Sequence, residues 1–105
     1  MQDQMINVCS LHDVPEGKAK TFVVNDRDIV IARYDGKFYA FDNLCTHDGG
    51  ILGDGEIYDG EIECPRHGAR FDITTGEATM MPAVADIETY DVHVDNDDIF
   101  VALSD

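Results

Sequence analysis

Two short segments of the sequence each combine a cysteine with a histidine. The first is Cys45-Thr46-His47 and the second is Cys64-Pro65-Arg66-His67, with sixteen residues between His47 and Cys64. Thiolate sulfur and imidazole nitrogen are common protein ligands for zinc and for iron centres. Each segment therefore offers one donor of each kind, and the four side chains are candidate metal ligands.

The spacing within the first segment bears on the kind of site. A single zinc ion with two cysteines and two histidines is one alternative, but zinc fingers usually group two cysteines in one half and separate paired ligands by at least two residues. Cys45 and His47 are separated by one residue. Along an extended chain such positions point the same way and lie about 6–7 Å apart. This spacing favours two metals in one cluster over one metal, although a turn can bring the pair closer.

A Rieske centre has this requirement, because one of its irons takes two cysteines and the other two histidines. The pattern Cys-x-His followed by Cys-x-x-His-Gly resembles the Rieske signature. The flanking sequence extends this resemblance to the ferredoxins of bacterial aromatic-ring dioxygenases over essentially the whole chain. The similar segments are 42–44, Gly68-Ala69-Arg70-Phe71-Asp72 through Thr75-Gly76, Pro82-Ala83 and the closing residues 87–103.

The resemblance implies one [2Fe–2S] cluster per chain, with a role for each candidate ligand. Cys45 and Cys64 would bind one iron, and His47 and His67 would bind the other. Glycines beside the ligands would let backbone N–H groups approach the bridging sulfides, because glycine has no side chain in the way and tolerates unusual dihedral angles. These glycines are Gly49, Gly50 and Gly68.

Departures from the Rieske proteins of respiratory complexes concern redox potential. Those proteins carry an extra cysteine in each loop, where this chain has Gly50 and Arg66, and a serine and a tyrosine where this chain has Ala69 and Phe71. Fewer hydrogen-bond donors leave the reduced cluster less stabilised. We therefore expect a midpoint near the lower end of the Rieske range, about −150 mV rather than +300 mV.

The function implied by the resemblance is electron transfer without catalysis. The chain would carry single electrons from a flavin-containing ferredoxin reductase to a terminal oxygenase through transient contacts, and it has no room for a mononuclear iron domain of its own. The open alternatives are a Rieske-like small subunit of an assimilatory nitrite reductase, a ferredoxin of another pathway, and a structural zinc module. Metal analysis separates the zinc module from the rest.

Length and charge restrict the setting. The 105 residues predict one domain, 1–105, and no apolar run approaches the ~20 residues of a membrane span. A net charge of −15 argues against nucleic acids and anionic membranes as partners. An acidic surface suits transient pairing with a basic partner, or simply keeps the protein soluble. Three cysteines and no signal-like start indicate a cytoplasmic protein, which we expect to be a monomer.

The periodicity of the chain predicts an all-β sandwich or barrel. The resemblance implies the Rieske fold, an antiparallel β-sandwich or barrel base with a cluster-binding subdomain of two loops. Asp35-Gly36 and Asp59-Gly60 lie between strand-like runs and predict hairpins. No window has a helical face, and only a turn is expected around residues 11–14. The expected strands are 21–24, 29–32, 38–41, 56–58, 61–63, 70–73, 89–94 and 99–103.

The other cysteine and histidines have simpler interpretations. Cys9 lies in the strand-like run 6–9 and is expected to be a buried apolar residue rather than a reactive thiol. His12 and His93 have no cysteine neighbours, and we expect solvent-facing or structural roles. The acidic residues 95, 97 and 98 predict a solvated turn. The acidic side chains between 54 and 63 predict a solvated hairpin, with a docking role as the alternative.

Overall fold

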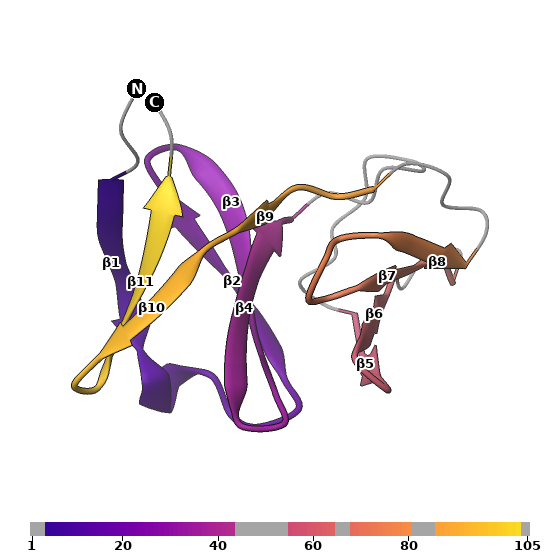
Figure 1. The fold of residues 1–105 in the computed structure, drawn as a ribbon, viewed down its shortest axis with the longest axis horizontal. Helices are drawn as coiled ribbons and strands as arrows, with labels where there is room; N and C mark the ends of the chain where they lie inside the picture. Colours follow the sequence, from indigo (N-terminus) through magenta and orange to yellow (C-terminus); the bar gives the residue numbers. More distant parts are fainter. Residues whose placement is uncertain (1–3, 44–54, 65–67, 81–85, 104–105) are drawn as a thin grey trace.

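The computed structural model describes residues 4–43, 55–64, 68–80 and 86–103. These residues form eleven β-strands and one 3₁₀ turn, with no α-helix among them (Figure 1). The prediction of an all-β chain is confirmed. Within the same residues, no helix has the length and apolar character needed to cross a membrane.

Seven strands form a base of two antiparallel sheets. The first has the order β1-β11-β10 and consists of β1 (Gln4–Ser10), β11 (Asp98–Leu103) and β10 (Val92–Asp95). The second has the order β2-β3-β4-β9 and consists of β2 (Ala19–Val24), β3 (Arg27–Tyr34), β4 (Lys37–Asp42) and β9 (Thr89–Tyr90). Because β9 runs into β10, the chain passes directly from one sheet to the other (Figure 1).

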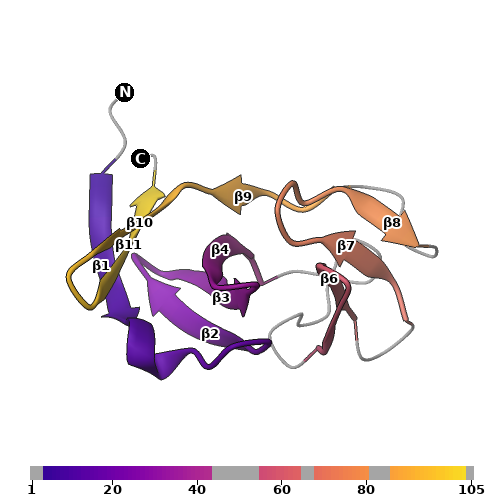
Figure 2. The same ribbon diagram turned by 60° about the horizontal axis from the view of Figure 1, so that its bottom comes forward.

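A third antiparallel sheet lies to one side of the base, in both views of the molecule (Figures 1 and 2). It has the order β5-β6-β7-β8 and consists of β5 (Ile57–Tyr58), β6 (Glu61–Glu63), β7 (Arg70–Asp72) and β8 (Ala78–Met80). In the chain it is inserted between β4 and β9. We call it the small sheet. The segment with Cys45 precedes it, and the segment with His67 falls between β6 and β7.

Tight turns fix the hairpins at the predicted positions. Asp35 and Gly36 have φ values of 54° and 76°, and Asp59 and Gly60 have 49° and 79°. Two successive residues with positive φ are the mark of a type I′ turn, whose twist matches that of the flanking strands. These turns set the register of β3 against β4 and of β5 against β6.

Strand β3 is buried on both faces. Ile29 and Ile31 face a hydrophobic core between the two sheets of the base, which we call the base core. Val30 and Ala32 face a second core, the interface core, in which the base packs against the small sheet. Each of these four side chains is 0% exposed. The continuous apolar run from 29 to 32 is therefore explained by burial on two sides, as in strands covered on both faces.

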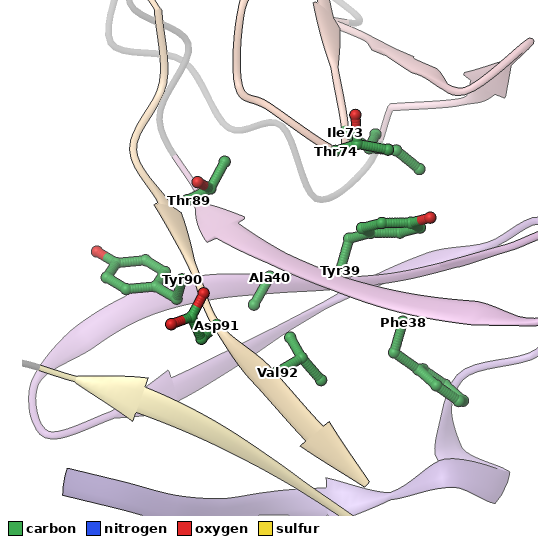
Figure 3. Close-up of a pocket in the computed structure, with 9 residues that line it drawn as sticks. All are labelled: Phe38, Tyr39, Ala40, Ile73, Thr74, Thr89, Tyr90, Asp91 and Val92. Atoms are coloured by element: carbon green, nitrogen blue, oxygen red, sulfur yellow. The ribbon is translucent and has the colours of Figure 1, made fainter. Parts of the chain in front are cut away.

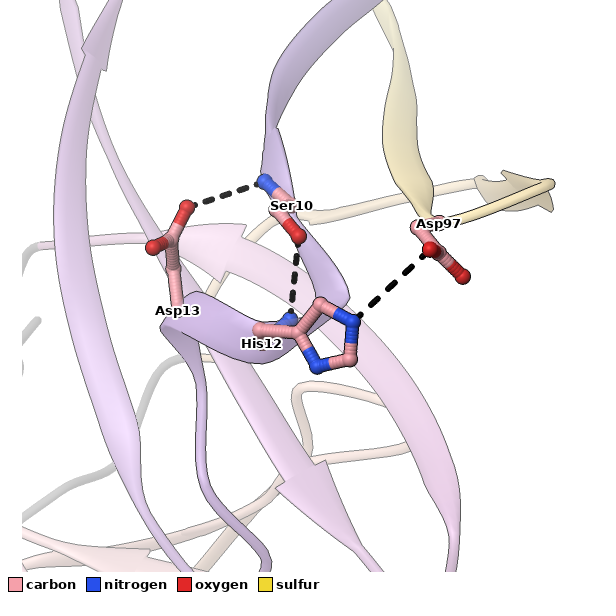
Figure 4. Close-up of polar contacts among 4 residues, drawn as sticks. All are labelled: Ser10, His12, Asp13 and Asp97. Atoms are coloured by element: carbon pink, nitrogen blue, oxygen red, sulfur yellow. Dashed lines mark hydrogen bonds and ion pairs between the residues drawn. The ribbon is translucent and has the colours of Figure 1, made fainter.

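Three elements differ from the sequence expectation. The expected strand 89–94 is divided at Asp91 into β9, which pairs with β4, and β10, which pairs with β11. Strand β8 was not expected, because Ala78-Thr79-Met80 has no run of β-branched or aromatic residues; it pairs with β7 through a register shift. Strand β1 begins earlier than the expected run, at Gln4. The turn expected near residues 11–14 is confirmed as the 3₁₀ turn Leu11–Asp13, capped by Ser10 (Figure 4).

Candidate metal centre

Cys64 is the one predicted ligand that lies within the described residues; Cys45, His47 and His67 lie outside them. Cys64 directly follows β6 and is 0% exposed. Its backbone N–H donates to the Ala69 carbonyl at 2.7 Å, and the Gly68 N–H donates to the Cys64 carbonyl at 3.0 Å. These two hydrogen bonds join the residue after β6 to the residues before β7. Gly68 has a φ of 77°, a conformation in which a side chain would be strained.

The surroundings of Cys64 fit a sulfur ligand to a metal. It belongs to the interface core with Ala69, Phe71, Ile62 and Ile73, all of them at most 1% exposed. Neither described cysteine, Cys9 or Cys64, is in a disulfide. Buried apolar side chains packed around a thiolate hold it in one orientation and keep water from the sulfur. Among the described residues no three side chains of metal-binding type lie together, and the four-ligand set stays a prediction.

The chain that leads toward Cys45 is held at the end of β4. The Asp42 N–H donates to the Glu88 carbonyl at 2.9 Å, and the Asn43 N–H donates to the Asp28 carbonyl at 3.0 Å. The hydroxyl of Tyr90 donates to Asp42 Oδ1 at 2.5 Å. Burial, followed by the bond to Asp42, raises the pKa of Tyr90 to about 12, so its hydroxyl remains a donor at neutral pH. Sequence reasoning missed this contact, since its partners are 48 residues apart.

The chain that returns from the small sheet is also fastened. Gly76, at φ 78°, accepts a hydrogen bond from the Ile87 N–H at 2.8 Å, and its own N–H donates to the Asp72 carbonyl at 2.7 Å. The Asp86 carboxylate accepts from the Ala78 N–H at 2.9 Å. A Cβ added to Gly76 would overlap the carbonyl oxygen of Ile87. Only glycine therefore fits where the return segment crosses the small sheet.

A charged network lies on the β5–β6–β7 surface next to Cys64. Arg70 is opposite Glu63 in the register of β6 and β7, and the Arg70 Nε to Glu63 Oε2 distance is 3.1 Å. The Arg70 guanidinium lies 5.1 Å from the Tyr58 ring centroid, and the Tyr58 hydroxyl donates to Glu56 at 2.9 Å. That bond raises the pKa of Tyr58. The acidic hairpin is thus partly neutralised by one arginine, a pairing that the cross-strand register could have indicated.

A pocket of about 210 Å³ lies away from Cys64, between β4, β9 and the residues after β7 (Figure 3). It is lined by Phe38, Tyr39, Ala40, Ile73, Thr74, Thr89, Tyr90, Asp91 and Val92. None of them is a predicted metal ligand. The pocket is thus lined by β4 and the β9–β10 passage of the base together with the two residues that follow β7.

The simpler interpretations of the remaining cysteine and histidines are confirmed. Cys9 is buried in the base core, and burial, followed by the charge of Asp13, raises its pKa to about 11. His12 is 73% exposed and its Nε2 lies 3.8 Å from Asp97 Oδ2, a surface contact between the 3₁₀ turn and the β10–β11 turn (Figure 4). His93 is exposed on β10. The raised pKa favours the thiol form of Cys9 at neutral pH, whereas the thiolate is the reactive form.

Comparison with known proteins decides the family. The model of the Rieske [2Fe–2S] domain matches residues 4–91. The chain belongs to the Rieske [2Fe–2S] family. A ferredoxin component of the naphthalene 1,2-dioxygenase/salicylate 5-hydroxylase systems of a Ralstonia species is 42% identical to it over 96 residues, which cover 91% of this chain and 92% of the relative. The predicted cofactor, one [2Fe–2S] cluster, is confirmed by this membership.

Solved structures agree with a Rieske ferredoxin. The ferredoxin of carbazole 1,9a-dioxygenase from Nocardioides aromaticivorans IC177 superposes with a TM-score of 0.89 at 35% identity, covering 93% of this chain and 96% of that one. A complex of reduced oxygenase and oxidised ferredoxin in carbazole 1,9a-dioxygenase matches with a TM-score of 0.86 at 29% identity over 93% and 92%. A nitrite reductase small subunit from Mycobacterium tuberculosis, 19% identical, covers 98% of this chain and 97% of that one at a TM-score of 0.87 and shows likeness of fold alone.

Two buried positions of this Rieske domain bear on its potential. Ala69 and Phe71 are both 0% exposed in the same core as Cys64. Neither side chain carries a hydroxyl, so neither can donate a hydrogen bond to a cluster sulfur. These two buried side chains are consistent with a low reduction potential, which stays a prediction.

Proposed function

We propose that this Rieske ferredoxin carries single electrons from a flavin-containing reductase to the terminal oxygenase of an aromatic-ring dioxygenase system. The observation that carries the proposal is the near full-length similarity to ferredoxin components of such systems, at 42% identity. When bound, the cluster accepts and gives up one electron at a time. On this account residues 1–105 act as a single Rieske domain.

The proposed ligands are Cys45 and Cys64 on one iron and His47 and His67 on the other. The buried, unpaired thiol of Cys64 supports this assignment, because a sulfur in a dry core next to a hairpin is suited to a soft metal. The side chains of the interface core would exclude water on the Cys64 side. Low polarity there and the absence of hydroxyls at Ala69 and Phe71 favour a midpoint near −150 mV.

Partner recognition would rest on charge and on brief contacts. The net charge of −15 would speed encounters with basic patches on the reductase and the oxygenase, and salt would slow them. Transient redox interfaces are small, below about 1,200 Å² in total. We propose that the protein works as a monomer in the cytoplasm, where a thiol outside the ligand set, such as Cys9, stays reduced.

The decisive experiment follows the electron directly. The reduced protein, freed of dithionite, is mixed anaerobically in a stopped-flow instrument with an oxidised terminal oxygenase of the naphthalene dioxygenase type. We expect the visible spectrum of the ferredoxin to return to the oxidised form at least tenfold faster than in buffer, with a rate that falls as salt rises. The isolated protein should titrate near −150 mV.

Two outcomes would contradict the proposal. A protein that titrates normally but passes no electrons to any aromatic-ring oxygenase would be a ferredoxin of another pathway. A colourless protein with one zinc would be a structural module. Metal analysis of the purified protein distinguishes these results before any kinetic measurement.

A further inference from the structure

Tyr90 joins the two strands through which the chain leaves and re-enters the base. Strand β4 ends at Asp42, beyond which lies the segment with Cys45 and His47, and β9 brings the chain back. The Tyr90 hydroxyl donates to Asp42 Oδ1 at 2.5 Å, and the backbone N–H of Asp42 donates to the Glu88 carbonyl at 2.9 Å. The exit and the return are thus tied by the antiparallel pairing of β4 with β9, by the Asp42–Glu88 backbone bond and by the Tyr90–Asp42 side-chain bond.

The residue after Asp42 is held as well. The Asn43 N–H donates to the Asp28 carbonyl at 3.0 Å, and its side-chain amide lies 3.4 Å from the Thr21 hydroxyl. Residues 42 and 43 are therefore fixed against β9, β3 and β2, two residues before Cys45. Of these contacts, the bond from Tyr90 is the shortest and the one to a carboxylate. Such charge-assisted bonds are about twice as strong as neutral ones.

We propose that Tyr90 is a positioning residue for the metal centre, whose hydroxyl fixes Asp42 and with it the point where the chain enters the Cys45–His47 segment. The proposal rests on the proposed ligand set. Tyr90 itself touches no predicted ligand among the described residues; it acts through Asp42. Figure 3 shows Tyr90 at the start of the β9–β10 passage, and Tyr90 is opposite Ala40 in the register of β9 and β4.

The surroundings of Tyr90 keep its hydroxyl a hydrogen-bond donor. It is half-buried, and its pKa of about 12 keeps the hydroxyl protonated across the pH range in which the protein would work. Replacement by phenylalanine would remove the donor while keeping the ring, its packing and the β4–β9 backbone pairing.

The test compares Tyr90→Phe with Tyr58→Phe in the cluster-loaded protein. Both variants delete one hydroxyl that binds a carboxylate, but Tyr58 binds Glu56 within the small sheet's own surface. The readouts are the rate at which an iron chelator removes the cluster well below the melting temperature, the EPR spectrum of the reduced protein, and amide hydrogen exchange at Asn43. A hydrogen bond to a charged group is worth a factor of roughly 10 to 100 in an equilibrium constant.

We expect Tyr90→Phe to release iron about tenfold faster, to broaden the EPR signal and to expose the Asn43 amide. We expect Tyr58→Phe to change the release rate by no more than about twofold. A second variant, Asp42→Asn, keeps an acceptor for the hydroxyl and should fall between wild type and Tyr90→Phe, with no additional effect when the two are combined.

Equal release rates and identical EPR spectra for Tyr90→Phe and wild type, whatever the change in melting temperature, would overturn the proposal and make Tyr90 a purely structural residue. So would a Tyr58→Phe variant that releases iron as fast as Tyr90→Phe. Failure of the proposed function has a different signature: a wild-type protein without a [2Fe–2S] spectrum would overturn the ligand set and this inference together.

Discussion

The base and the small sheet are built from strands of different length. Five of the seven base strands, β1, β2, β3, β4 and β11, contain six to eight residues, and β9 and β10 contain two and four. Strands β5 to β8 contain two or three. The base encloses its own hydrophobic core, while the small sheet completes a core only together with Val30, Ala32 and Phe41 of the base. Sheets of such short strands are not stable alone.

The difference in strand length and core indicates that the base and the small sheet have different roles in stability and in metal binding. Because the base encloses its own core, we expect it to keep its fold without metal, whereas we expect the small sheet to depend on the base and on the cluster. Metal binding contributes folding free energy to the elements that carry the ligands. Changes in the interface core should therefore affect the cluster first, and changes in the base core should affect global stability.

The largest effect should follow loss of the Cys64 ligand or removal of the metal. We expect Cys64→Ser to abolish the [2Fe–2S] spectrum, because a buried serine hydroxyl cannot replace the thiolate. Amides of β5 to β8 should lose hydrogen-exchange protection while those of β3 and β11 keep it. The control, Cys9→Ala, removes the buried thiol of the base core and should leave the visible spectrum intact. Retention of a full cluster by Cys64→Ser would contradict the assignment.

Cavities in the two cores should separate the two regions. Phe71→Ala in the interface core should cost about 3–5 kcal/mol and Ile99→Ala in the base core about 2–5 kcal/mol, since both side chains are 0% exposed. Urea unfolding followed by visible absorbance reports the cluster, and far-ultraviolet circular dichroism reports the base. Phe71→Ala should shift the absorbance transition to lower urea more than the dichroism transition. Coincident shifts in both variants would mean that the molecule unfolds as one unit.

The glycine at the crossing of the two regions offers a smaller, more local test. Gly76→Ala should destabilise by about 2 kcal/mol or more, because positive φ alone costs about 1–2 kcal/mol and the new Cβ would overlap the Ile87 carbonyl. Gly36→Ala is the matched control: its φ is 76° and its Cβ would meet nothing within 4 Å. The free energies of unfolding of both variants decide the matter. An equal loss of unfolding free energy at the two positions would mean that the overlap with the Ile87 carbonyl adds nothing to the strain of positive φ.

The smallest effect concerns acid stability of the small sheet. The Thr74 hydroxyl donates to Asp72 at 2.6 Å, and this bond is the main reason that the Asp72 pKa is lowered. A lowered pKa stabilises the fold above the unfolded value of about 3.9 and loses that effect as pH falls through the folded value. Thr74→Val should cost no more than about 0.5 kcal/mol at pH 7, because solvent screens the site, and nothing at pH 2. Unfolding at both pH values, with the exposed Thr79→Val as control, checks this; a constant difference would exclude Asp72 as the cause.

The sequence predicts different amounts of the two regions, for physical reasons. Alternating or continuous apolar runs and Asp-Gly turns define the long strands of the base, and β3 and β4 were predicted within a few residues. Strand β8 escaped prediction because it is held by pairing with β7 rather than by its own composition. The Tyr90–Asp42 bond could not be predicted either, since only the folded chain brings these positions together.

The predicted metal ligands were found from the sequence more than from the structure. Cys45, His47, Cys64 and His67 are predicted by spacing and by resemblance, and of the four the structure bears on Cys64 alone, as a buried, unpaired thiol. The role of Gly76 is visible only in the structure, because the clash that excludes a side chain comes from Ile87, eleven residues away.

The most direct test of the account is the absorption and low-temperature EPR spectrum of the purified protein before and after reduction, with iron, sulfide and zinc measured on the same sample. The account predicts a red-brown protein with two irons and two sulfides per chain. It should take up one electron and give a rhombic signal with an average g value below that of four-cysteine clusters. A colourless protein with zinc, or a reduced signal typical of four cysteine ligands, would contradict the histidine-ligated electron carrier proposed here.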